Sequence, residues 1–472
     1  MLKKTLLELL EKGHIYEVKN PFAVNPLSVS EDPSGKKRLI LDLTYINKFL
    51  WKEKIKFDDW KSFENYVDEG KEGYLFKFDL KSGYHHIDIH EDSQKYLGFS
   101  WKFSDGTVKY LQYAVLPFGL SSGPFIFTKV VRVLIKYWRS YAIKIACFLD
   151  DGLSIDFDKD QAIKNSKFVK ESLSEAGFIA NHEKSQWEPV KVIQWLGVII
   201  DFEQNIFAIS DKRIHSALKS IENILNIPNR ITARQLARLA GKIISTKFVL
   251  GNVVRLRTRY LYRLIESRVS WDKTFNVLHC NEVVEEILFW KFNLCALNKR
   301  PIIKYDVPQL KVFSDASSTG IGAFYDQNVS YRNLYIFEMG ESSTFRELLA
   351  IKHSLASFDS SLKNKHLLWH TDNMGAAQII RVGSNKILLQ NLALEIYLIC
   401  HKNDIALTVT WISRKLNQVA DKISKSIDYD DWTIKNELFC FIEKLWGKLT
   451  IDLFADNKNK KCKRFCSRYW CP

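Results

Sequence analysis

The sequence predicts a mixed α+β fold over residues 1–210, a helical segment over 211–305 and an α/β unit over 306–428. Three observations predict this division. Short apolar strands alternate with helical patterns, at Gly123 to Tyr141 and Gln161 to Ala176, in the first region. The second region changes to charged helices. In the third region, two strands end on acids and a helix lies between them.

The composition indicates a globular chain with a polyanionic partner. Of 472 residues, 46% are hydrophobic, which is enough for several buried cores. The net charge is +15, with 69 Lys and Arg against 54 Asp and Glu, and nucleic acid is the partner that fits best. The eight Cys show no paired framework, which favours an intracellular location, cytoplasmic or nuclear. No apolar run approaches the ~18 residues of a membrane span, so we expect no anchor and no signal peptide.

A strand–turn–strand pattern from Ile145 to Ile155 carries two adjacent acids. Five apolar or small residues lead into Asp150 and Asp151, Gly152 follows, and apolar residues then resume. The acids are therefore expected at the tip of a hairpin. Adjacent carboxylates repel unless a cation lies between them, which favours a divalent-metal site. A solvated Asp-Asp-Gly turn is the alternative that this stretch alone leaves open.

A third acid, Asp79, lies in an apolar strand. Phe76, Phe78 and Leu80 alternate along one side of this strand, so Asp79 has apolar neighbours and needs a partner. One carboxylate on a strand and two on a hairpin tip supply the oxygen ligands that two-metal phosphoryl transfer requires.

At these acids the chain resembles the reverse transcriptases, and the match continues over about 160 residues. The matching motifs, in chain order, are Gly35–Asn47 in the fingers, Phe78–Tyr84 in the palm, Leu116–Pro124 in the nucleotide-positioning loop, Phe148–Asp151 at the paired acids, Ala176–Phe178 with Lys184, and Trp195–Gly197 in the primer grip. Phe148 stands where the family usually has Tyr, which is a mild departure. Motifs in this order are not expected by chance.

The resemblance implies a right-hand polymerase with fingers, a palm and a helical thumb. It implies that Asp79, Asp150 and Asp151 hold two Mg²⁺ ions, with Mn²⁺ as the alternative ion. It also implies a set of residues that contact the dNTP or the primer: Arg38 along the triphosphate, Tyr84 beneath the deoxyribose, Phe118 and Gly119 in the positioning loop, Lys184 near the pyrophosphate, and Leu196 and Gly197 in the primer grip.

The helical region carries much of the positive charge. Residues 229–268 contain ten Lys or Arg and one acid. Thr232 and Gln235 form a capping box that opens a helix. A solvated helix face is the simple interpretation, but beside a polymerase palm we expect the helix to grip the phosphate backbone. Three cations follow one another on one face of this helix at four-residue spacing: Arg234, Arg238 and Lys242.

A second set of acids follows in the order Asp, Glu, Asp, Asp. One strand ends on Asp315, a helix carries Glu347, another strand ends on Asp372, and Asp421 comes last. This pattern resembles RNase H, in which four carboxylates bind two Mg²⁺ ions and the RNA strand of a hybrid is hydrolysed. Simpler explanations stay open, because Thr344 and Glu347 fit a capping box and Asp is common where strands end.

Two features of the last part of the chain refine this interpretation. Many retroelement RNases H carry a His ten residues before the last Asp, and Trp411 stands there, so we expect metal binding to survive while turnover is in question. The segment 446–457 is similar to one that follows RNase H in DIRS-group retrotransposons, which favours that group over gypsy-type elements.

The final stretch, 429–472, is interpreted as the basic tail of one piece of a larger polyprotein. Cys462, Cys466 and Cys471 lie there among Lys and Arg. A zinc knuckle needs a fourth ligand that this spacing lacks, so we expect a flexible tail rather than a metal site.

The sequence therefore predicts an RNA- and DNA-templated DNA polymerase with RNase H activity. Its expected partners are an RNA template, a DNA primer, an RNA/DNA hybrid and dNTPs, with no membrane. Two alternatives stay open: a decayed or domesticated relic that only binds nucleic acid, and a polymerase whose RNase H fold is structural. All seven expected acid positions hold Asp or Glu, which argues against decay. The oligomeric state is not predicted.

Overall fold

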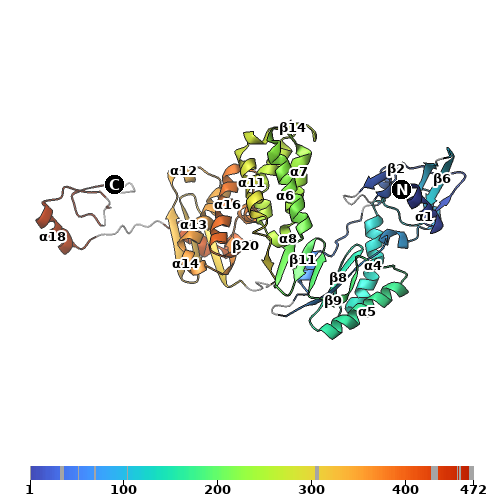
Figure 1. The fold of residues 1–472 in the computed structure, drawn as a ribbon. Helices are drawn as coiled ribbons and strands as arrows, with labels where there is room; N and C mark the ends of the chain where they lie inside the picture. The colour runs from blue at the N-terminus through green and yellow to red at the C-terminus, as the bar shows by residue number, and fades with distance from the viewer. Residues whose placement is uncertain are drawn as a thin grey trace. The chain divides into compact units, whose positions relative to one another are not determined.

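The computed structural model describes residues 2–31, 37–51, 53–67, 71–103, 105–302, 308–426, 434–453, 455 and 459–466. The chain divides into two compact units. The first is Met1–Val254 with Leu264–Lys304, and the second is Arg255–Arg263 with Tyr305–Pro472 (Figure 1). Arg255–Arg263 thus packs with the second unit although it lies in the helical region of the sequence. The finer four-part division into 1–210, 211–305, 306–428 and 429–472 stays a prediction.

The N-terminal part of the first unit is built on small antiparallel sheets. Its elements are α1 (Leu2–Glu11), β1 (Ile15–Glu17), β2 (Leu27–Glu31), β3 (Lys37–Leu41), α2 (Trp60–Glu64), α3 (Glu91–Gln94), β5 (Gly98–Lys102) and β6 (Val108–Tyr113). β2 pairs with β3, and β6 lies between β1 and β5. Leu6 of α1, Leu41 of β3 and Phe99 of β5 share one buried core.

A four-stranded sheet follows, and it positions the first group of acids. Its strands, in the spatial order β7-β8-β4-β9, are β7 (Lys144–Phe148), β8 (Asp151–Asp156), β4 (Tyr74–Asp79) and β9 (Gln186–Val190). One face is covered by α4 (Gly123–Ser140) and α5 (Lys159–Glu175), which confirms the two predicted helices (Figure 1). Phe76 and Phe78 pack into this core. Because side chains alternate along a strand, Lys77 and Asp79 point to the opposite face.

The rest of the first unit is a second sheet and a group of helices. The sheet order is β10-β11-β12-β15, with β10 (Val192–Trp195), β11 (Val198–Asp201), β12 (Ile206–Ile209) and β15 (Arg300–Pro301). The helices are α6 (Asp211–Asn226), α7 (Ala233–Ile244), α8 (Lys247–Leu250), α9 (Val253–Leu256), α10 (Arg259–Glu266) and α11 (Asn281–Asn293), and the short strands β13 (Ile231–Thr232) and β14 (Thr274–Phe275) pair beside them. α9 and α10 each have residues assigned to both units, because Arg255–Arg263 belongs to the second. The capping box of Thr232 and Gln235 at α7 is confirmed.

The second unit is a five-stranded sheet with helices packed on it. The sheet order is β18-β17-β16-β19-β20, with β16 (Leu310–Ala316), β17 (Gly320–Tyr325), β18 (Asn328–Asn333), β19 (His366–Thr371) and β20 (Ala406–Trp411). β16 runs parallel to β19, and β19 parallel to β20. The helices are α12 (Ile336–Met339), α13 (Ser343–Ser357), α14 (Asp359–Leu362), α15 (Met374–Val382), α16 (Ile387–Lys402) and α17 (Gln418–Ser424).

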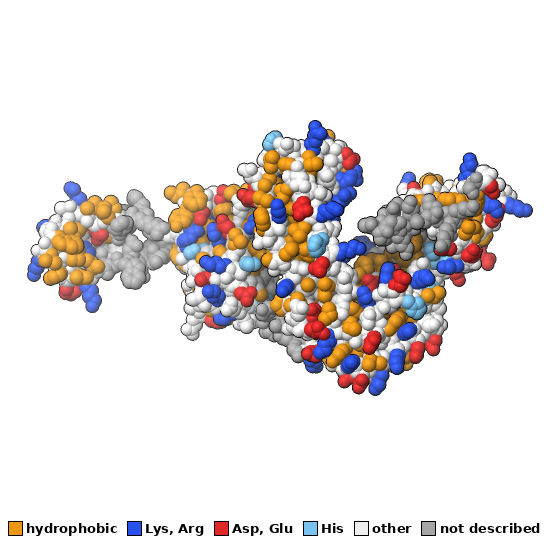
Figure 2. Space-filling model, viewed as in Figure 1, with side chains coloured by type: hydrophobic (Ala, Val, Ile, Leu, Met, Phe, Trp, Pro, Cys, Tyr) orange, Lys and Arg blue, Asp and Glu red, His pale blue; other side chains and the backbone are white. Residues whose placement is uncertain are grey.

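The described part of the tail contains α18 (Asn436–Trp446) and the short strands β21 (Ile451–Asp452) and β22 (Arg464–Phe465), which pair in parallel. Hydrophobic side chains gather on the surface of α18, where Leu438, Phe441 and Leu445 are exposed (Figure 2). Within the described residues, no helix combines the length and the apolar character that crossing a bilayer would need.

Candidate active sites

Asp79, Asp150 and Asp151, here called the first acidic site, meet where two strands of the four-stranded sheet end. Asp79 is the last residue of β4 and lies directly opposite Asp151, the first residue of β8. Asp150 lies in the turn between β7 and β8, where Leu149 has a φ of 56°. The backbone around the acids is fixed, because Leu80 N–H donates to the Asp150 carbonyl at 2.9 Å. The predicted hairpin with acids at its tip is confirmed.

Gly152 does not form the turn that the sequence pattern suggested. It lies inside β8, opposite Phe78 of β4. A Cβ at Gly152 would come within 2.3 Å of Phe78 Cζ, so only Gly lets this ring pack over the hairpin. The glycine therefore serves the packing of the sheet, and the turn is made by Leu149 and Asp150.

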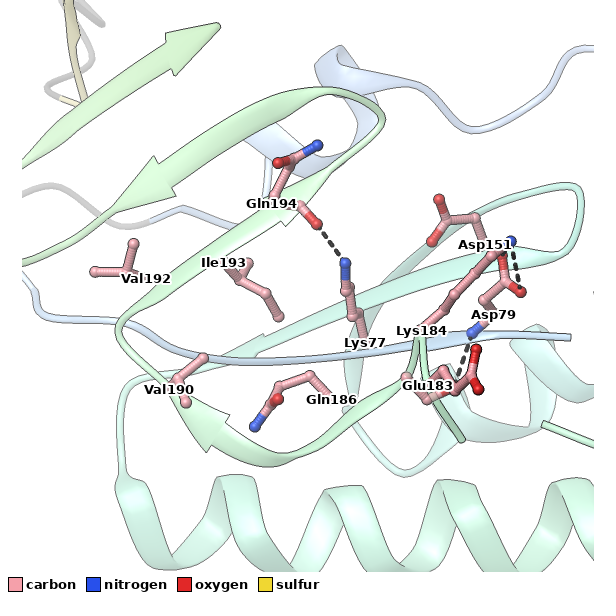
Figure 3. Close-up of a pocket in the computed structure, with 11 residues that line it drawn as sticks. Lys77, Asp79, Asp151, Glu183, Lys184, Gln186, Val190, Val192, Ile193 and Gln194 are labelled. Carbon is pink, nitrogen blue, oxygen red and sulfur yellow. Dashed lines mark hydrogen bonds and ion pairs between the residues drawn. The ribbon is translucent and has the colours of Figure 1, made fainter. Parts of the chain in front are cut away.

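The first acidic site is electrostatically crowded. Burial, with Asp79 and Asp150 adding to it, raises the pKa of Asp151 to about 7, although Lys77 and Lys184 oppose the shift. Lys184 Nζ lies 3.2 Å from Asp79 Oδ2 and partly balances the charge. A cavity of about 560 Å³ opens on this face, lined by Lys77, Asp79, Asp151 and Lys184 among others (Figure 3). Oxygen ligands with excess negative charge suit a hard divalent cation.

The predicted nucleotide-binding residues fall into one neighbourhood. The rings of Tyr84 and Phe118 stack with centroids 5.1 Å apart. Gly119 has a φ of 114°, and a Cβ there would meet the Leu41 carbonyl oxygen at 1.9 Å, so this loop passes very close to β3. Arg38 belongs to β3, but its side chain lies outside the described residues. The structure thus brings the positioning loop against the strand that carries Arg38.

The predicted primer-grip residues form the tight turn between β10 and β11. Leu196 and Gly197 have φ values of 44° and 78°. A Cβ at Gly197 would meet Arg213 Nε at 2.2 Å, so a side chain there would displace the Arg213 guanidinium and would also be strained by the positive φ. Trp195 Nε1–H donates to the Asp151 carbonyl at 3.2 Å, which links this turn to the first acidic site.

The three predicted phosphate-binding cations of α7 differ in their surroundings. Arg234 pairs with Asp272, with Nε 3.0 Å from Oδ1. Lys242 Nζ donates to the Ser216 carbonyl at 2.7 Å and so packs on α6. Arg238 is exposed. Lys and Arg side chains gather over the helical region that includes α7 (Figure 2). The basic surface exists, but two of the three cations also make contacts within the protein.

In the second unit, Asp315, Glu347 and Asp372 form the second acidic site. Each offers a carboxylate oxygen, and these oxygens all lie within 4.8 Å of one another. Glu347 accepts hydrogen bonds from Ala316 N–H at 3.2 Å and from Thr371 Oγ1 at 3.0 Å. Burial, with Asp315 and Asp372 adding to it, raises the pKa of Glu347 to about 8. Burial also raises the pKa of Asp315.

The capping-box explanation for Glu347 is wrong. Helix α13 begins at Ser343, and its N-cap is Ser342, whose side chain accepts from Phe345 N–H. Glu347 lies one turn further along, is only 3% exposed, and faces the sheet instead of the helix terminus. A buried carboxylate that does not cap a helix needs other partners, and the Ala316 N–H and the Thr371 hydroxyl supply two of them.

The fourth predicted acid, Asp421, is not part of the group within 4.8 Å. It lies on α17 and pairs with Lys425, with Nζ 2.6 Å from Oδ2, and with Arg414, with Nη2 2.9 Å from Oδ1. Lys425 and Arg414 lower the pKa of its carboxyl. Trp411, which stands where the family's His was expected, is half exposed, and its indole N–H donates to the Asp372 carbonyl at 2.9 Å.

In the tail, Cys462 is buried and Cys466 is exposed, and both are free thiols, while Cys471 lies outside the described residues.

Several residues that hold the acids were missed by sequence reasoning. Ser185 Oγ accepts from Asp79 N–H at 3.1 Å, and Ser424 Oγ donates to Asp315 Oδ2 at 2.6 Å. These contacts join distant parts of the chain and have no local pattern. Lys77 was also missed, although the sequence pattern could have identified it. It lies two residues before Asp79 on a strand, and such residues share one face of the strand.

Comparison with known proteins adds independent information. Residues 31–200 match the family model described as reverse transcriptase (RNA-dependent DNA polymerase). The enzymatic polyprotein of Cassava vein mosaic virus is 26% identical over 444 residues, which are 90% of this chain and 64% of that protein. The retrovirus-related Pol polyprotein from transposon opus of Drosophila melanogaster is 24% identical over 454 residues, covering 90% of this chain and 42% of the polyprotein.

A solved structure of the foamy viral protease-reverse transcriptase in complex with RNA/DNA hybrid has a TM-score of 0.54 and 18% sequence identity. The match covers 92% of this chain and 56% of that chain. This likeness confirms the predicted fold class. The chain spans less than two-thirds of the length of the two polyproteins, and the choice between DIRS-group and gypsy-type elements stays a prediction.

Proposed function

We propose that this chain extends a DNA primer with dNTPs on RNA and DNA templates, because residues 31–200 match the reverse transcriptase family model and the chain is similar to retrotransposon and viral polyproteins. One observation carries the proposal. Asp79 lies directly opposite Asp151, with Asp150 in the adjoining turn, inside the region that matches the family. This is the arrangement of oxygen ligands that two-metal phosphoryl transfer needs.

The residues of the first acidic site fit a pair of Mg²⁺ ions. Asp79 and Asp151 lie opposite each other with Asp150 beside them in the turn, although their carboxylate oxygens do not form a group within 4.8 Å in the described residues. Burial, with Asp79 and Asp150 adding to it, raises the pKa of Asp151, so a cation would stabilise the ionised carboxylates. Bound Mg²⁺ would lower the pKa of the primer 3′-hydroxyl and stabilise charge on the leaving pyrophosphate. The fit rests on the oxygen donors and their charge, and Mn²⁺ would satisfy the same ligands.

The remaining residues would orient the substrates. Arg38 would neutralise the triphosphate with its planar guanidinium. Lys184, released from its ion pair with Asp79, would donate a proton to the departing pyrophosphate. Tyr84, stacked on Phe118, would lie under the deoxyribose. Leu196 and Gly197 would hold the primer end, while Arg234, Arg238 and Lys242 would contact phosphates of the template–primer duplex, the first and last through rearranged side chains.

A second activity, RNase H, is favoured by the second acidic site. One carboxylate oxygen from each of Asp315, Glu347 and Asp372 lies within 4.8 Å of the others, and a divalent cation would stabilise carboxylates at that spacing when they are ionised. We assign to them the binding of Mg²⁺ and the hydrolysis of the RNA strand of an RNA/DNA hybrid. Asp421 would join them when Lys425 and Arg414 turn toward phosphates. These roles imply an intracellular protein, cytoplasmic or nuclear.

Primer extension by the Asp150→Asn variant tests the polymerase function. We expect extension on both RNA and DNA templates with Mg²⁺ to be lost, because a metal ligand is removed. Primer–template affinity should change by less than about twofold, since affinity comes mainly from phosphate contacts. Asp160→Asn is the matched control, because Asp160 is exposed in the first turn of α5.

Wild-type extension by Asp150→Asn would reject the assignment of the site. A wild-type protein that binds primer–template but extends neither template would instead favour the nucleic-acid-binding relic.

A further inference from the structure

Lys77 occupies an unusual place beside the first acidic site. It lies on β4, two residues before Asp79, and points into the same cavity as Asp79 and Asp151 (Figure 3). Its Nζ donates to the backbone carbonyl of Gln194 in β10 at 2.7 Å. The lysine therefore spans from the catalytic strand to the strand that leads into the Leu196–Gly197 turn.

β4 and β10 belong to different sheets. β4 is in the sheet β7-β8-β4-β9, and β10 is the first strand of β10-β11-β12-β15. No backbone ladder between them is present in the described residues. The start of β10 is placed by β9, which pairs with β4 and precedes β10 by one residue, and side chains add anchors further along the β10–β11 hairpin. Two side-chain hydrogen bonds do so at consecutive residues. Lys77 binds the Gln194 carbonyl, and Trp195 Nε1–H binds the Asp151 carbonyl at 3.2 Å.

The turn at Leu196 and Gly197 follows directly after these two anchored residues. Both turn residues have a left-handed backbone, so the turn itself is tightly determined. Its position relative to the acids then depends on the anchors at Gln194 and Trp195. A charged donor to a carbonyl makes a stronger bond than a neutral one, and the four-carbon stem of Lys gives the reach to cross the cavity.

We propose that Lys77 is a positioning residue for DNA synthesis. Its ammonium group holds the β10–β11 hairpin against β4 and so sets where the primer end lies relative to Asp79 and Asp151. This inference rests on the proposed polymerase function, in which the Leu196–Gly197 turn contacts the primer. Lys77 acts through the hairpin and needs no contact with the reacting atoms.

The test compares three proteins in the full chain. Lys77→Met removes the donor but keeps the length of the stem. Lys77→Arg keeps a charged donor. Lys109→Met is the matched control, because Lys109 lies on β6 and its Nζ pairs with Glu17 at 2.7 Å, outside the cavity. The measurements are the single-turnover rate of nucleotide incorporation, primer–template affinity, and hydrogen exchange of the amides of residues 192–201.

For Lys77→Met we expect incorporation to slow by roughly 10- to 100-fold, because small displacements of reacting groups have effects of this size. Primer–template affinity should stay within about twofold, since phosphate contacts elsewhere are intact. The hairpin amides should exchange faster. Lys77→Arg should stay close to wild type in both rate and exchange, and so should Lys109→Met.

Two results would overturn the proposal. One is an unchanged incorporation rate in Lys77→Met. The other is a slower rate with unchanged hairpin exchange, since Lys77 would then act only through its charge on the acids. If Lys77→Met fails to fold, Lys77→Gln replaces it, because the amide is too short to reach Gln194. Absence of primer extension by the wild-type chain would reject the polymerase function itself. An active wild type together with an unchanged incorporation rate in Lys77→Met would reject only the role of Lys77.

Discussion

At the scale of single residues, the surroundings of a side chain decide its chemistry. Tyr84 is a half-buried aromatic that stacks on Phe118, and burial together with the nearby Asp150 raises the pKa of its phenol. The ring is thus held rigidly beside the acids, with its hydroxyl neutral. Glu347 is a carboxyl that burial among other acids keeps protonated until about pH 8. Neither property belongs to the residue type alone.

Tyr84→Ala is expected to raise the incorporation of ribonucleotides relative to deoxyribonucleotides. The ring under the sugar would collide with a 2′-hydroxyl, and its removal opens that space. The ratio of incorporation rates for matched rNTP and dNTP measures the effect, which we expect to be about tenfold or more. Tyr84→Phe is the control, because it keeps the ring and should keep the ratio. An unchanged ratio in a folded Tyr84→Ala protein would identify Tyr84 as a plain core aromatic.

Glu347 should make the metal-free protein less stable as pH rises. Its pKa is raised from 4.5 in the unfolded chain to about 8 in the folded one, so the folded state binds more protons between these values. The associated stabilisation is present below about pH 4.5 and is lost as pH rises through 8, with a total on the order of a few kcal/mol. Thermal unfolding in EDTA at pH 5 and pH 8 measures it.

Mg²⁺ at pH 8 should restore stability, because it binds the ionised carboxylates. Glu347→Gln should flatten the pH dependence in EDTA. A melting temperature of the second unit that rises between pH 5 and pH 8 without metal would contradict the crowding of these acids.

At the scale of elements, the β7–β8 hairpin carries the first acidic site through a close packing contact. Gly152 lies under the ring of Phe78, and this contact joins β8 to β4 immediately behind Asp151 and Asp79. Because Gly152 has no side chain, the ring of Phe78 can pack against β8 directly after the two acids at the tip of the hairpin. The register Asp79 opposite Asp151 depends on that fit.

Gly152→Ala should destabilise the first unit by about 1–3 kcal/mol, because the added methyl group overlaps Phe78 in a packed core. Chemical denaturation followed by tryptophan fluorescence measures the loss. Gly241→Ala is the matched control, since Gly241 lies in α7 with nothing within 4 Å of the added Cβ. That change should be neutral or stabilising by up to about 1 kcal/mol. Equal effects of the two substitutions would argue against the Phe78 contact.

At the scale of the whole molecule, each acidic site belongs to its own compact unit. The first site lies in Met1–Val254, and the second lies in Tyr305–Pro472. The second unit also takes in Arg255–Arg263, where the Leu256 carbonyl accepts from Gln390 Nε2 at 2.7 Å. The units are therefore not simple consecutive pieces of the chain. The acids of the first site nevertheless all precede those of the second in the sequence.

Glu347→Gln should stop cleavage of the RNA strand of a hybrid and leave DNA synthesis within about twofold of wild type. The reason is that the two sites belong to separate compact units, and residues that share no partner act independently to first order. Primer extension and hybrid cleavage, measured on the same preparation, check this. Asp150→Asn should show the reverse pattern. Loss of both activities in Glu347→Gln would mean that the two units are coupled.

The sequence by itself determined the fold class and the acids. Period-two alternation placed Asp79 on a strand, and the apolar runs around Asp150 and Asp151 predicted the hairpin, because these patterns are local. The helices at 123–141 and 161–176 were predicted for the same reason, as was the capping box at Thr232. The charge surplus indicated a nucleic-acid partner before any contact was known.

Only the tertiary structure decided how these residues are held. It moved Gly152 from the turn into a strand, because Phe78 of another strand needs its space, and it removed Glu347 from the helix cap, because Ser342 already fills that place. It paired Asp421 with Lys425 and Arg414 and left it outside the group within 4.8 Å, although Asp421 still helps to raise the pKa of Asp315. It also joined Lys77 to Gln194. The physical reason is that a local pattern decides on which face of a helix or strand a side chain lies. Contacts between segments that are distant in the sequence form only when the chain has packed.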